Sequence, residues 1–111
     1  MLIYKALRAE EWAALQAAGR TDGAPVDVAD GYIHFSTAEQ LPTTLSKHFA
    51  GENNLILLAC EGDSLSPALR WEPSRGGALF PHLYRELRLS DVVWHRLIPL
   101  GRAGHEPGEL A

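Results

Sequence analysis

The chain has 111 residues, a length that suits one domain with one hydrophobic core. Apolar residues make up 46% and charged residues 22%, as is usual for a soluble globular protein. The formal net charge of −4 argues against broad, sequence-independent nucleic-acid binding, which needs a basic surface. It does not argue against one nucleotide held in a local pocket.

The sequence gives no sign of export or of membrane insertion. No apolar run approaches the roughly 18 residues that a membrane-spanning helix needs. The N-terminus lacks a basic leader followed by an apolar stretch, so no signal peptide is expected. The single Cys60 can form no internal disulfide, and its place in the apolar run LILLAC predicts a buried structural thiol. We therefore expect a cytoplasmic protein.

The first 30 residues are expected to form a strand, a helix and a loop. Residues 2–7 are short and apolar, as in a strand. Residues 9–19 have the composition of a helix, with Trp12 and Leu15 on one face. Residues 20–30, RTDGAPVDVAD, contain Gly, Pro and three Asp and predict a loop long enough to act as a functional flap.

The stretch DGYIHFST, residues 30–37, alternates like a strand. Tyr32, His34 and Ser36 share the face opposite its apolar residues. An aromatic hydroxyl, an imidazole and a serine in a row are unusual on an open strand face, so this face is a candidate site. A capping box is the alternative explanation for Ser36 or Thr37, since Glu or Gln follows each at the required spacing.

The rest of the chain is expected to hold one more helix and then only strands. A tight turn over residues 38–41 should precede a helix that starts near Pro42 and ends at Gly51. Strands are predicted over residues 53–60, 69–73, 80–86 and 91–100, the first of them central in its sheet. With two helices and about six short strands, the fold class is α+β. Residues 1–100 form one domain, and residues 101–111 a flexible tail.

The stretch FPHLYRE, residues 80–86, carries a second candidate cluster. His82, Tyr84 and Glu86 would share one face of an extended segment. If this face and that of residues 30–37 line one cleft, the site has two imidazoles, two phenols and a carboxylate. Such a set can bind a ribose–phosphate ligand, stack a base and polarise a leaving group. The alternative is that Tyr84 packs in the core and Glu86 pairs with a neighbouring arginine.

Glu72, in the short strand LRWEP, is a third candidate. Leu69 and Trp71 are expected to face inward, and Arg70 and Glu72 outward. A lone Glu in such a place is usually solvated. Beside a cleft, it could steady an oxocarbenium ion or activate a hydroxyl nucleophile.

Motifs of several large functional classes are missing from the sequence. The five histidines show no H-x-x-x-H spacing and the single cysteine has no partner motif, so no metal site is predicted. There is no G-x-G-x-x-G after a strand, no P-loop and no G-x-S-x-G elbow. Classical dinucleotide-binding folds and serine hydrolases are therefore disfavoured.

The blocks DGYIHFSTAEQL and LRWEPSRGGALFPHLYREL resemble a small bacterial family catalogued as domain of unknown function 952. The resemblance runs from about Leu2 to Ile98. It implies an ADP-ribosyltransferase-like fold, with two small, mostly antiparallel sheets around a cleft and two helices in the N-terminal half. Folds of that kind bind NAD between the sheets, so the resemblance implies a nucleotide ligand, with NAD as a candidate substrate.

Carried over by position, the resemblance also implies roles for individual residues. Tyr4 and Lys5 would lie where those enzymes have a His or Arg that grips the ligand. Residues 34–37 would form the motif that flanks the nicotinamide, and the catalytic motif would fall on Glu72 or within residues 82–86.

The candidate catalytic residues are His34, His82 and Glu72. The candidate binding residues are Tyr4, Lys5, Tyr32, Ser36, Thr37 and Tyr84. They favour a cleft for NAD, ADP-ribose or a related ribonucleotide, with ADP-ribosyl transfer or hydrolysis of a glycosidic or phosphate bond as the reaction.

Two alternatives stay open. One is a binding or interaction module without turnover. The other is a two-histidine phosphoesterase, for which His34-x-Ser36 supplies one motif while His82-x-Tyr84 lacks the right second hydroxyl.

Overall fold

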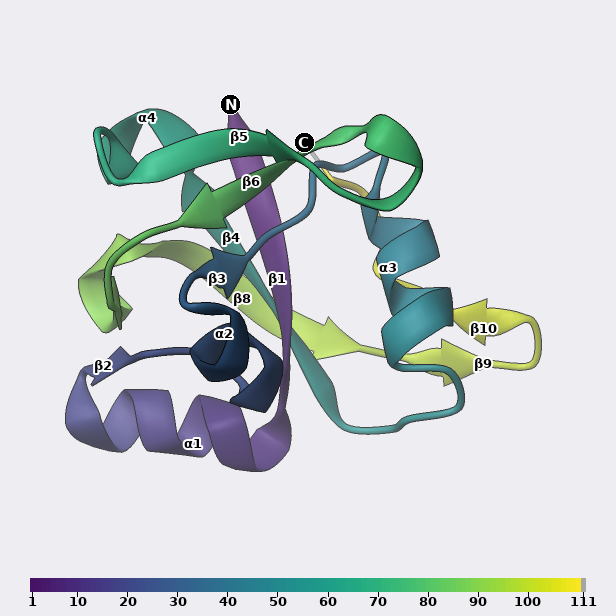
Figure 1. The fold of residues 1–111 in the computed structure, drawn as a ribbon. Helices are drawn as coiled ribbons and strands as arrows, with labels where there is room; N and C mark the ends of the chain where they lie inside the picture. Colours follow the sequence, from purple (N-terminus) through teal and green to yellow (C-terminus); the bar gives the residue numbers. More distant parts are fainter. Residues whose placement is uncertain (111) are drawn as a thin grey trace.

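The centre of the fold is a three-stranded antiparallel sheet (Figure 1). The computed structural model describes residues 1–110, with the backbone alone for Arg75. The strands of this central sheet, in order, are β1 (Leu2–Arg8), β4 (Leu55–Glu61) and β8 (Val92–Ile98). The apolar run of β4 is buried between its two neighbours, which confirms the central strand predicted there.

A second three-stranded sheet carries most of the candidate residues. Its strands, in order, are β3 (Ile33–His34), β6 (Leu79–Leu83) and β5 (Leu69–Pro73), all antiparallel. After β3, Phe35 N donates a 3.0 Å hydrogen bond to Pro81 O. The next residue, Ser36, exchanges two backbone hydrogen bonds of 2.8 Å with Tyr4 of β1. The chain therefore passes from the edge of one sheet to the edge of the other within two residues.

Helices pack around the two sheets and confirm the α+β class (Figure 1). They are α1 (Ala9–Ala18), α2 (Pro25–Asp30), α3 (Leu41–His48), α4 (Gly62–Leu65) and the short 3-10 turns η1 (Arg75–Gly77) and η2 (Leu89–Asp91). Helix α3 begins one residue before Pro42, its expected start, because proline is tolerated in a first helical turn. Within residues 1–110, no helix is long and apolar enough to cross a membrane.

The segment 20–30 is not the loop that its composition predicted, because it contains a short strand and helix α2. Pro25 lies in the first turn of α2, where its fixed φ suits a helix. The carboxylate of Asp27 accepts a 2.7 Å hydrogen bond from the backbone N–H of Ala24 and so caps the helix that contains it. The expectation of two helices in the N-terminal half is wrong for the same reason.

Two short antiparallel pairs complete the sheets. They join β2 (Arg20–Thr21) with β7 (Leu87–Arg88), and β9 (Leu100–Gly101) with β10 (Gly104–His105). The second pair begins at Leu100 and extends into residues 101–111, the expected flexible tail. His105 Nε2 lies 2.8 Å from Glu52 O. The guanidinium of Arg96 donates to Pro107 O at 2.6 Å, so this segment folds back onto the domain.

Strands β1 and β4 of the central sheet are covered on both faces, whereas β8 leaves Val93, His95 and Leu97 exposed. One face packs against α1 and the second sheet through Ile3, Leu7, Trp12, Leu15, Ile33, Phe35, Leu58, Cys60, Leu65, Leu83 and Leu87. The other packs against α3 through Tyr4, Ala6, Leu41, Leu45, Leu55, Leu57, Ala59 and Ile98. Cys60 is fully buried, as predicted.

Strand β5 places its side chains on the predicted faces but buries them less than predicted. Leu69 is the cross-strand partner of Leu83 in the core, and Trp71 that of Pro81. Trp71, expected to face inward, is 40% exposed, and Leu69 is only partly buried. The reason is that β5 is an edge strand of the second sheet, and none of its side chains is fully buried. Glu72 lies on the face opposite Leu69, as predicted, and on that face its carboxylate contacts His82 of the neighbouring strand.

Candidate functional site

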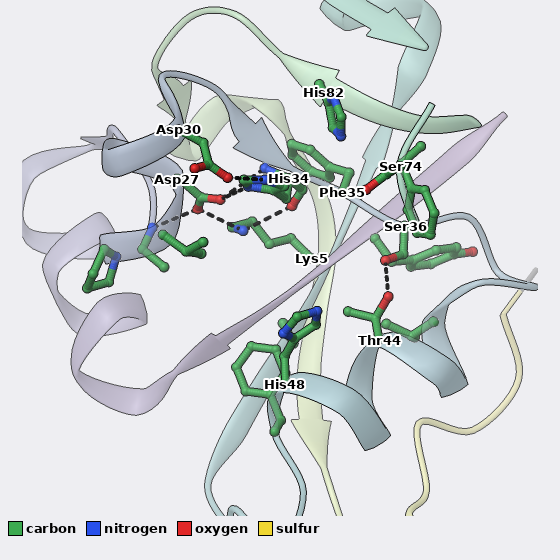
Figure 2. A pocket seen from close by; sticks show the side chains of 18 of the residues that line it. Lys5, Asp27, Asp30, His34, Phe35, Ser36, Thr44, His48, Ser74 and His82 are labelled. Atoms are coloured by element: carbon green, nitrogen blue, oxygen red, sulfur yellow. Dashed lines mark hydrogen bonds and ion pairs between the residues drawn. The ribbon is translucent and has the colours of Figure 1, made fainter. Parts of the chain in front are cut away.

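A pocket of about 600 Å³ lies where the two three-stranded sheets meet (Figure 2). Its lining comes from β1, α2, the end of β3 and the residues after it, α3 and β6. One part of the lining is polar and contains Lys5, Asp27, Asp30, His34 and His82. Another part is apolar, with Leu41, Phe49 and Phe80, and includes the hydroxyls of Ser36 and Thr44. An apolar wall with a few convergent polar groups is the usual character of a small-molecule site.

His34 and His82 come together on the wall of this pocket. They are direct cross-strand partners in the register of β3 and β6. Their ring centroids lie 5.3 Å apart, with the ring planes at 68°. The ring of Tyr32 packs on both imidazoles, with centroid distances of 4.6 Å to His34 and 4.2 Å to His82. Tyr84 is next to Tyr32, at 5.2 Å. The structure thus assembles one aromatic cluster from the two predicted faces.

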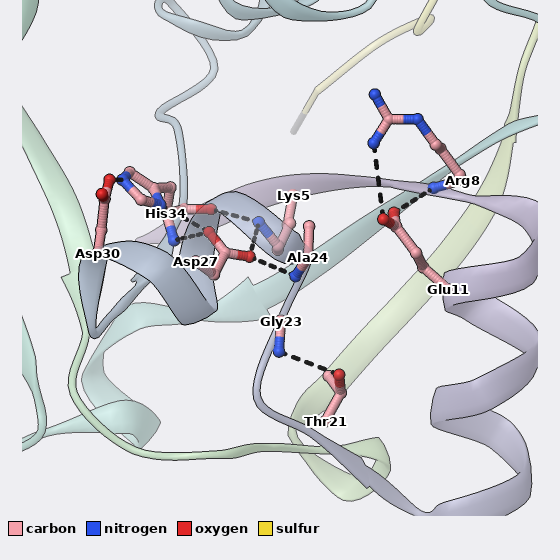
Figure 3. A network of polar contacts seen from close by, with 9 residues as sticks. All are labelled: Lys5, Arg8, Glu11, Thr21, Gly23, Ala24, Asp27, Asp30 and His34. Atoms are coloured by element: carbon pink, nitrogen blue, oxygen red, sulfur yellow. Dashed lines mark hydrogen bonds and ion pairs between the residues drawn. The ribbon is translucent and has the colours of Figure 1, made fainter.

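The ring of His34 lies between two aspartates of α2 (Figure 3). His34 Nδ1 lies 2.6 Å from Asp27 Oδ1, and Nε2 lies 3.0 Å from Asp30 Oδ2. The backbone N–H of His34 also donates to Asp27 Oδ1, at 3.0 Å. Both ring nitrogens therefore face carboxylate oxygens, and the ring orientation is fixed from the side of α2.

Asp27 is the buried hub of this network (Figure 3). Its side chain is 0% exposed, and its Oδ2 lies 2.9 Å from Lys5 Nζ, itself on a side chain that is only 8% exposed. The Lys5 ammonium also donates to His34 O, at 3.0 Å. Burial raises the pKa of the Asp27 carboxyl, but the hydrogen bond from His34 and the charge of Lys5 outweigh burial and lower that pKa to about 2. Asp27 therefore stays ionised at neutral pH.

His82 is held differently from His34. Its side chain is 3% exposed, and Nδ1 lies 2.8 Å from Glu72 Oε1. The hydroxyl of Tyr84 donates to the same Glu72 oxygen at 2.7 Å. The hydrogen bonds from Tyr84 and His82 lower the pKa of Glu72. Glu72 is not part of the lining of the large pocket, so it reaches the pocket only through the His82 ring.

Ser36 and Thr37 have different places in the structure. Ser36 is buried and lines the pocket, and its Oγ lies 2.8 Å from Thr44 Oγ1 on α3. Thr37 and Gln40 exchange the two hydrogen bonds typical of a capping box, in the turn that precedes α3: Thr37 N donates to Gln40 Oε1 at 3.0 Å, and Gln40 N donates to Thr37 Oγ1 at 3.2 Å. The structural explanation therefore holds for Thr37, while Ser36 faces the cavity.

The remaining candidates are divided between two cavities. Tyr4 and Lys5, implied by the resemblance on the first strand, both line the large pocket. Tyr32 and Tyr84 line a second cavity of about 300 Å³, in which Asp27 also takes part. Glu86 lies 3.4 Å from the Arg88 guanidinium, so the arginine pairing considered for it is what the structure shows.

Asp27 and Asp30 were not among the predicted site residues. The signal that could have pointed to Asp27 is Pro25 two positions before it, since proline followed by an acidic residue is typical of a helix N-terminus. That signal predicts a cap. It does not predict the contact with Lys5, which lies in another part of the sequence. Among residues 1–110, no group of three or more His, Cys, Asp and Glu side chains is arranged to hold a metal ion.

Comparison with known proteins decides the family. The model of the family described as "Protein of unknown function (DUF952)" matches residues 6–95, most of the chain. The chain belongs to the DUF952 family. No curated protein matches this DUF952 domain.

Solved structures resemble the DUF952 domain closely. The X-ray crystal structure of protein CC0527 from Caulobacter crescentus is 50% identical, covers 95% of this chain and 92% of its own, and has a TM-score of 0.91. A crystal structure of a double mutant of CC0527 gives 48% identity and the same TM-score of 0.91. The solution NMR structure of CC0527 gives 50% identity and a TM-score of 0.84, over 94% of this chain and 90% of its own. These likenesses establish the fold of the DUF952 domain, and its function has to be argued from the site.

Proposed function

We propose that the large pocket binds a ribonucleotide of the NAD or ADP-ribose type, and that the histidine pair acts on a bond of its ribose. One observation carries the proposal. The imidazoles of His34 and His82 meet, with ring centroids 5.3 Å apart, on the wall of a pocket of about 600 Å³. That volume lies within the range of pockets that enclose an organic ligand of this size.

The two kinds of lining match the two ends of a nucleoside. A flat base can lie against the apolar wall of Leu41, Phe49 and Phe80. The ribose hydroxyls then face the polar part, where His34 and the hydroxyl of Ser36 line the cavity. His82 is the imidazole best placed to move a proton there, because only one of its ring nitrogens is bound to a protein group within the described chain.

The ADP-ribosyltransferase-like fold that the family resemblance implies supports the choice of ligand. Those folds bind NAD between two small antiparallel sheets, and the pocket here lies at the junction of two such sheets. Tyr4 and Lys5 reach the pocket from β1 of the central sheet, and His82 reaches it from β6 of the second. The reaction we propose is transfer or hydrolysis at the glycosidic carbon of the ribose.

A two-histidine phosphoesterase is the second candidate, favoured by the cross-strand pairing of His34 with His82. A two-histidine phosphoesterase also needs a hydroxyl beside each histidine in the pocket, and the structure supports this less well. Tyr84, two residues after His82, donates its hydroxyl to Glu72 and does not line the large pocket. The glycosidic reaction is therefore the better supported of the two.

The test is an NMR titration of the labelled protein with NAD, ADP-ribose and AMP. We expect shifts at residues 32–36 and 80–84 that are lost in His82→Gln and kept in His95→Gln. His95 is a matched control, since it is exposed on β8 and its ring packs on Trp12, away from the pocket.

The same samples separate an enzyme from a binding module. Release of free base from a nucleotide that binds supports the enzyme, and binding without release over a long incubation supports the module. No shift with any of the three compounds at millimolar concentration contradicts the proposed ligand class.

A further inference from the structure

The two imidazoles of the pocket have unequal surroundings. Both ring nitrogens of His34 lie against carboxylates, at 2.6 Å from Asp27 and 3.0 Å from Asp30. In His82, Nδ1 lies 2.8 Å from Glu72 Oε1. Among the residues that the structure describes, Nε2 of His82 has no hydrogen-bond partner. No described protein group therefore has to be displaced for a ligand in the pocket to bond to Nε2 of His82, whereas Asp30 has to be displaced from Nε2 of His34.

The partner of His82 decides which of its nitrogens carries a proton. An ionised carboxylate only accepts hydrogen bonds, so Nδ1 of His82 has to be the donor. In the neutral ring, Nε2 then carries the lone pair and can take up a proton. Free imidazole side chains are not fixed in this way, so the tautomer of His82 depends on Glu72.

Glu72 is itself held in place by the second sheet. Its Oε1 accepts a second hydrogen bond, 2.7 Å long, from the hydroxyl of Tyr84. The Arg70 guanidinium lies over the Tyr84 ring, 5.1 Å from its centroid. Glu72 and His82 lie on paired strands, with Arg70 directly opposite His82 in the register. The carboxylate is therefore fixed by the backbone of β5 and by a hydroxyl from the residue that follows β6.

We propose that His82 is the proton-transferring residue of the pocket and that Glu72 is the positioning residue that holds it with Nδ1 protonated. The catalytic part rests on the proposed function. In hydrolysis, the oxygen of a water bonds to the ribose carbon as the carbon–nitrogen bond breaks and its electron pair leaves with the base. The proton of that water passes to His82 Nε2. Glu72, which the sequence suggested as a catalytic group, acts through the imidazole.

The test reads the tautomer directly in the ligand-free protein. Long-range proton–nitrogen correlation spectra distinguish the two nitrogens of each imidazole, and we would record them at about pH 8.5, where an ordinary histidine is neutral. The variants are Glu72→Met and Tyr84→Phe. Glu86→Met is the matched control, because Glu86 pairs with an exposed arginine and touches no imidazole.

The proposal expects His82 to carry its proton on Nδ1 in the native protein, in Tyr84→Phe and in the control. It expects a shift toward the Nε2-protonated form in Glu72→Met, with the signals of His34 unchanged. A native His82 protonated on Nε2 overturns the proposal, and so does a native tautomer that persists in Glu72→Met. Because no ligand is present, either result is independent of whether nucleotides bind.

A kinetic arm applies if the native protein turns over a nucleotide. Loss of the positioning carboxylate should then lower kcat by about 10²-fold at unchanged KM, within the range of general acid–base catalysis. An equal loss in Glu86→Met would overturn the assignment of Glu72.

Discussion

Lys5 Nζ and Asp27 Oδ2 lie 2.9 Å apart, and both side chains are almost completely removed from solvent. The two residues come from β1 and α2, so the ion pair ties a short helix to the central sheet. The other oxygen of Asp27 contacts the His34 ring at 2.6 Å. One buried carboxylate thus connects helix α2, the central sheet and the wall of the pocket.

Removing either partner of this pair should destabilise the fold, and by unequal amounts. In Asp27→Asn, the ammonium of Lys5 stays buried without its counter-ion, so we expect a loss of about 3 kcal/mol or more in the free energy of unfolding. In Lys5→Met, Asp27 keeps the donors of Ala24 and His34, so the loss should be smaller. Urea unfolding measures both. A larger loss in Lys5→Met than in Asp27→Asn would contradict this account of the pair.

The stability of the protein should depend on Asp27 at low pH. The pKa of Asp27 is about 2 in the folded protein, against 3.8 for the unperturbed group, so the unfolded chain takes up this proton first as the pH falls. The stabilisation is fully present above about pH 4 and is lost progressively toward pH 2, with a total of about 2 kcal/mol. Urea unfolding at several pH values should show a shallower pH dependence in Asp27→Asn. The exposed Asp22→Asn is the control, and an unchanged slope in Asp27→Asn would refute the linkage.

Gly23 and Gly31 flank α2 and should respond differently to the same substitution. Both have positive φ angles, 101° and 87°, so alanine is strained at either position. At Gly23, an added Cβ would also clash with Asp27 Oδ2, whereas at Gly31 it would meet nothing within 4 Å. We expect Gly31→Ala to cost about 1 kcal/mol of unfolding free energy, and Gly23→Ala clearly more. Only Gly23→Ala should also shift the ring signals of His34, and equal effects of the two variants would rule out the clash.

The thiol of Cys60 should be unreactive in the folded protein. Burial, followed by the negative charge of Asp91, raises the pKa of Cys60 to about 12, so almost no thiolate exists at neutral pH. A disulfide reagent that releases a coloured thiolate should therefore react with Cys60 only as fast as the protein unfolds in buffer. In concentrated denaturant it should react at once. Fast reaction under native conditions would show that the core around β4 opens locally.

Much of the fold follows from patterns that a short stretch of sequence contains. The apolar run LILLAC within residues 53–60 predicted a central strand, and β4 is one. The alternation in residues 30–37 predicted Tyr32 and His34 on one face, and their rings do pack together. In each case the signal, either the alternation of side chains along a strand or a run of apolar residues, is contained in a few consecutive residues.

Other features depend on contacts that no single stretch reveals. Gly, Pro and Asp occur both in loops and at helix N-termini, so the composition of residues 20–30 did not decide between a loop and a helix. The ion pair of Asp27 with Lys5, which ties α2 to the central sheet, is a contact between distant parts of the sequence. Trp71 is 40% exposed on β5, whose place at an edge of the second sheet depends on the order of strands in the sheet. The partnership of Glu72 with His82 depends on the register between β5 and β6.

The single bridge between Tyr4 and Ser36 also determines what kind of surface the pocket presents. Because Tyr4 turns its backbone groups away from β4 and toward Ser36, the alternation of an antiparallel strand turns those of Ala6 the same way. Ala6 is part of the pocket lining. The N–H and C=O of Ala6 thus lie on the side of β1 that faces away from β4, at a residue of the pocket lining, and they are the same whatever side chain stands at this position. Substitutions can replace the imidazoles and carboxylates of the pocket, but the backbone groups of β1 stay the same as long as the fold is kept.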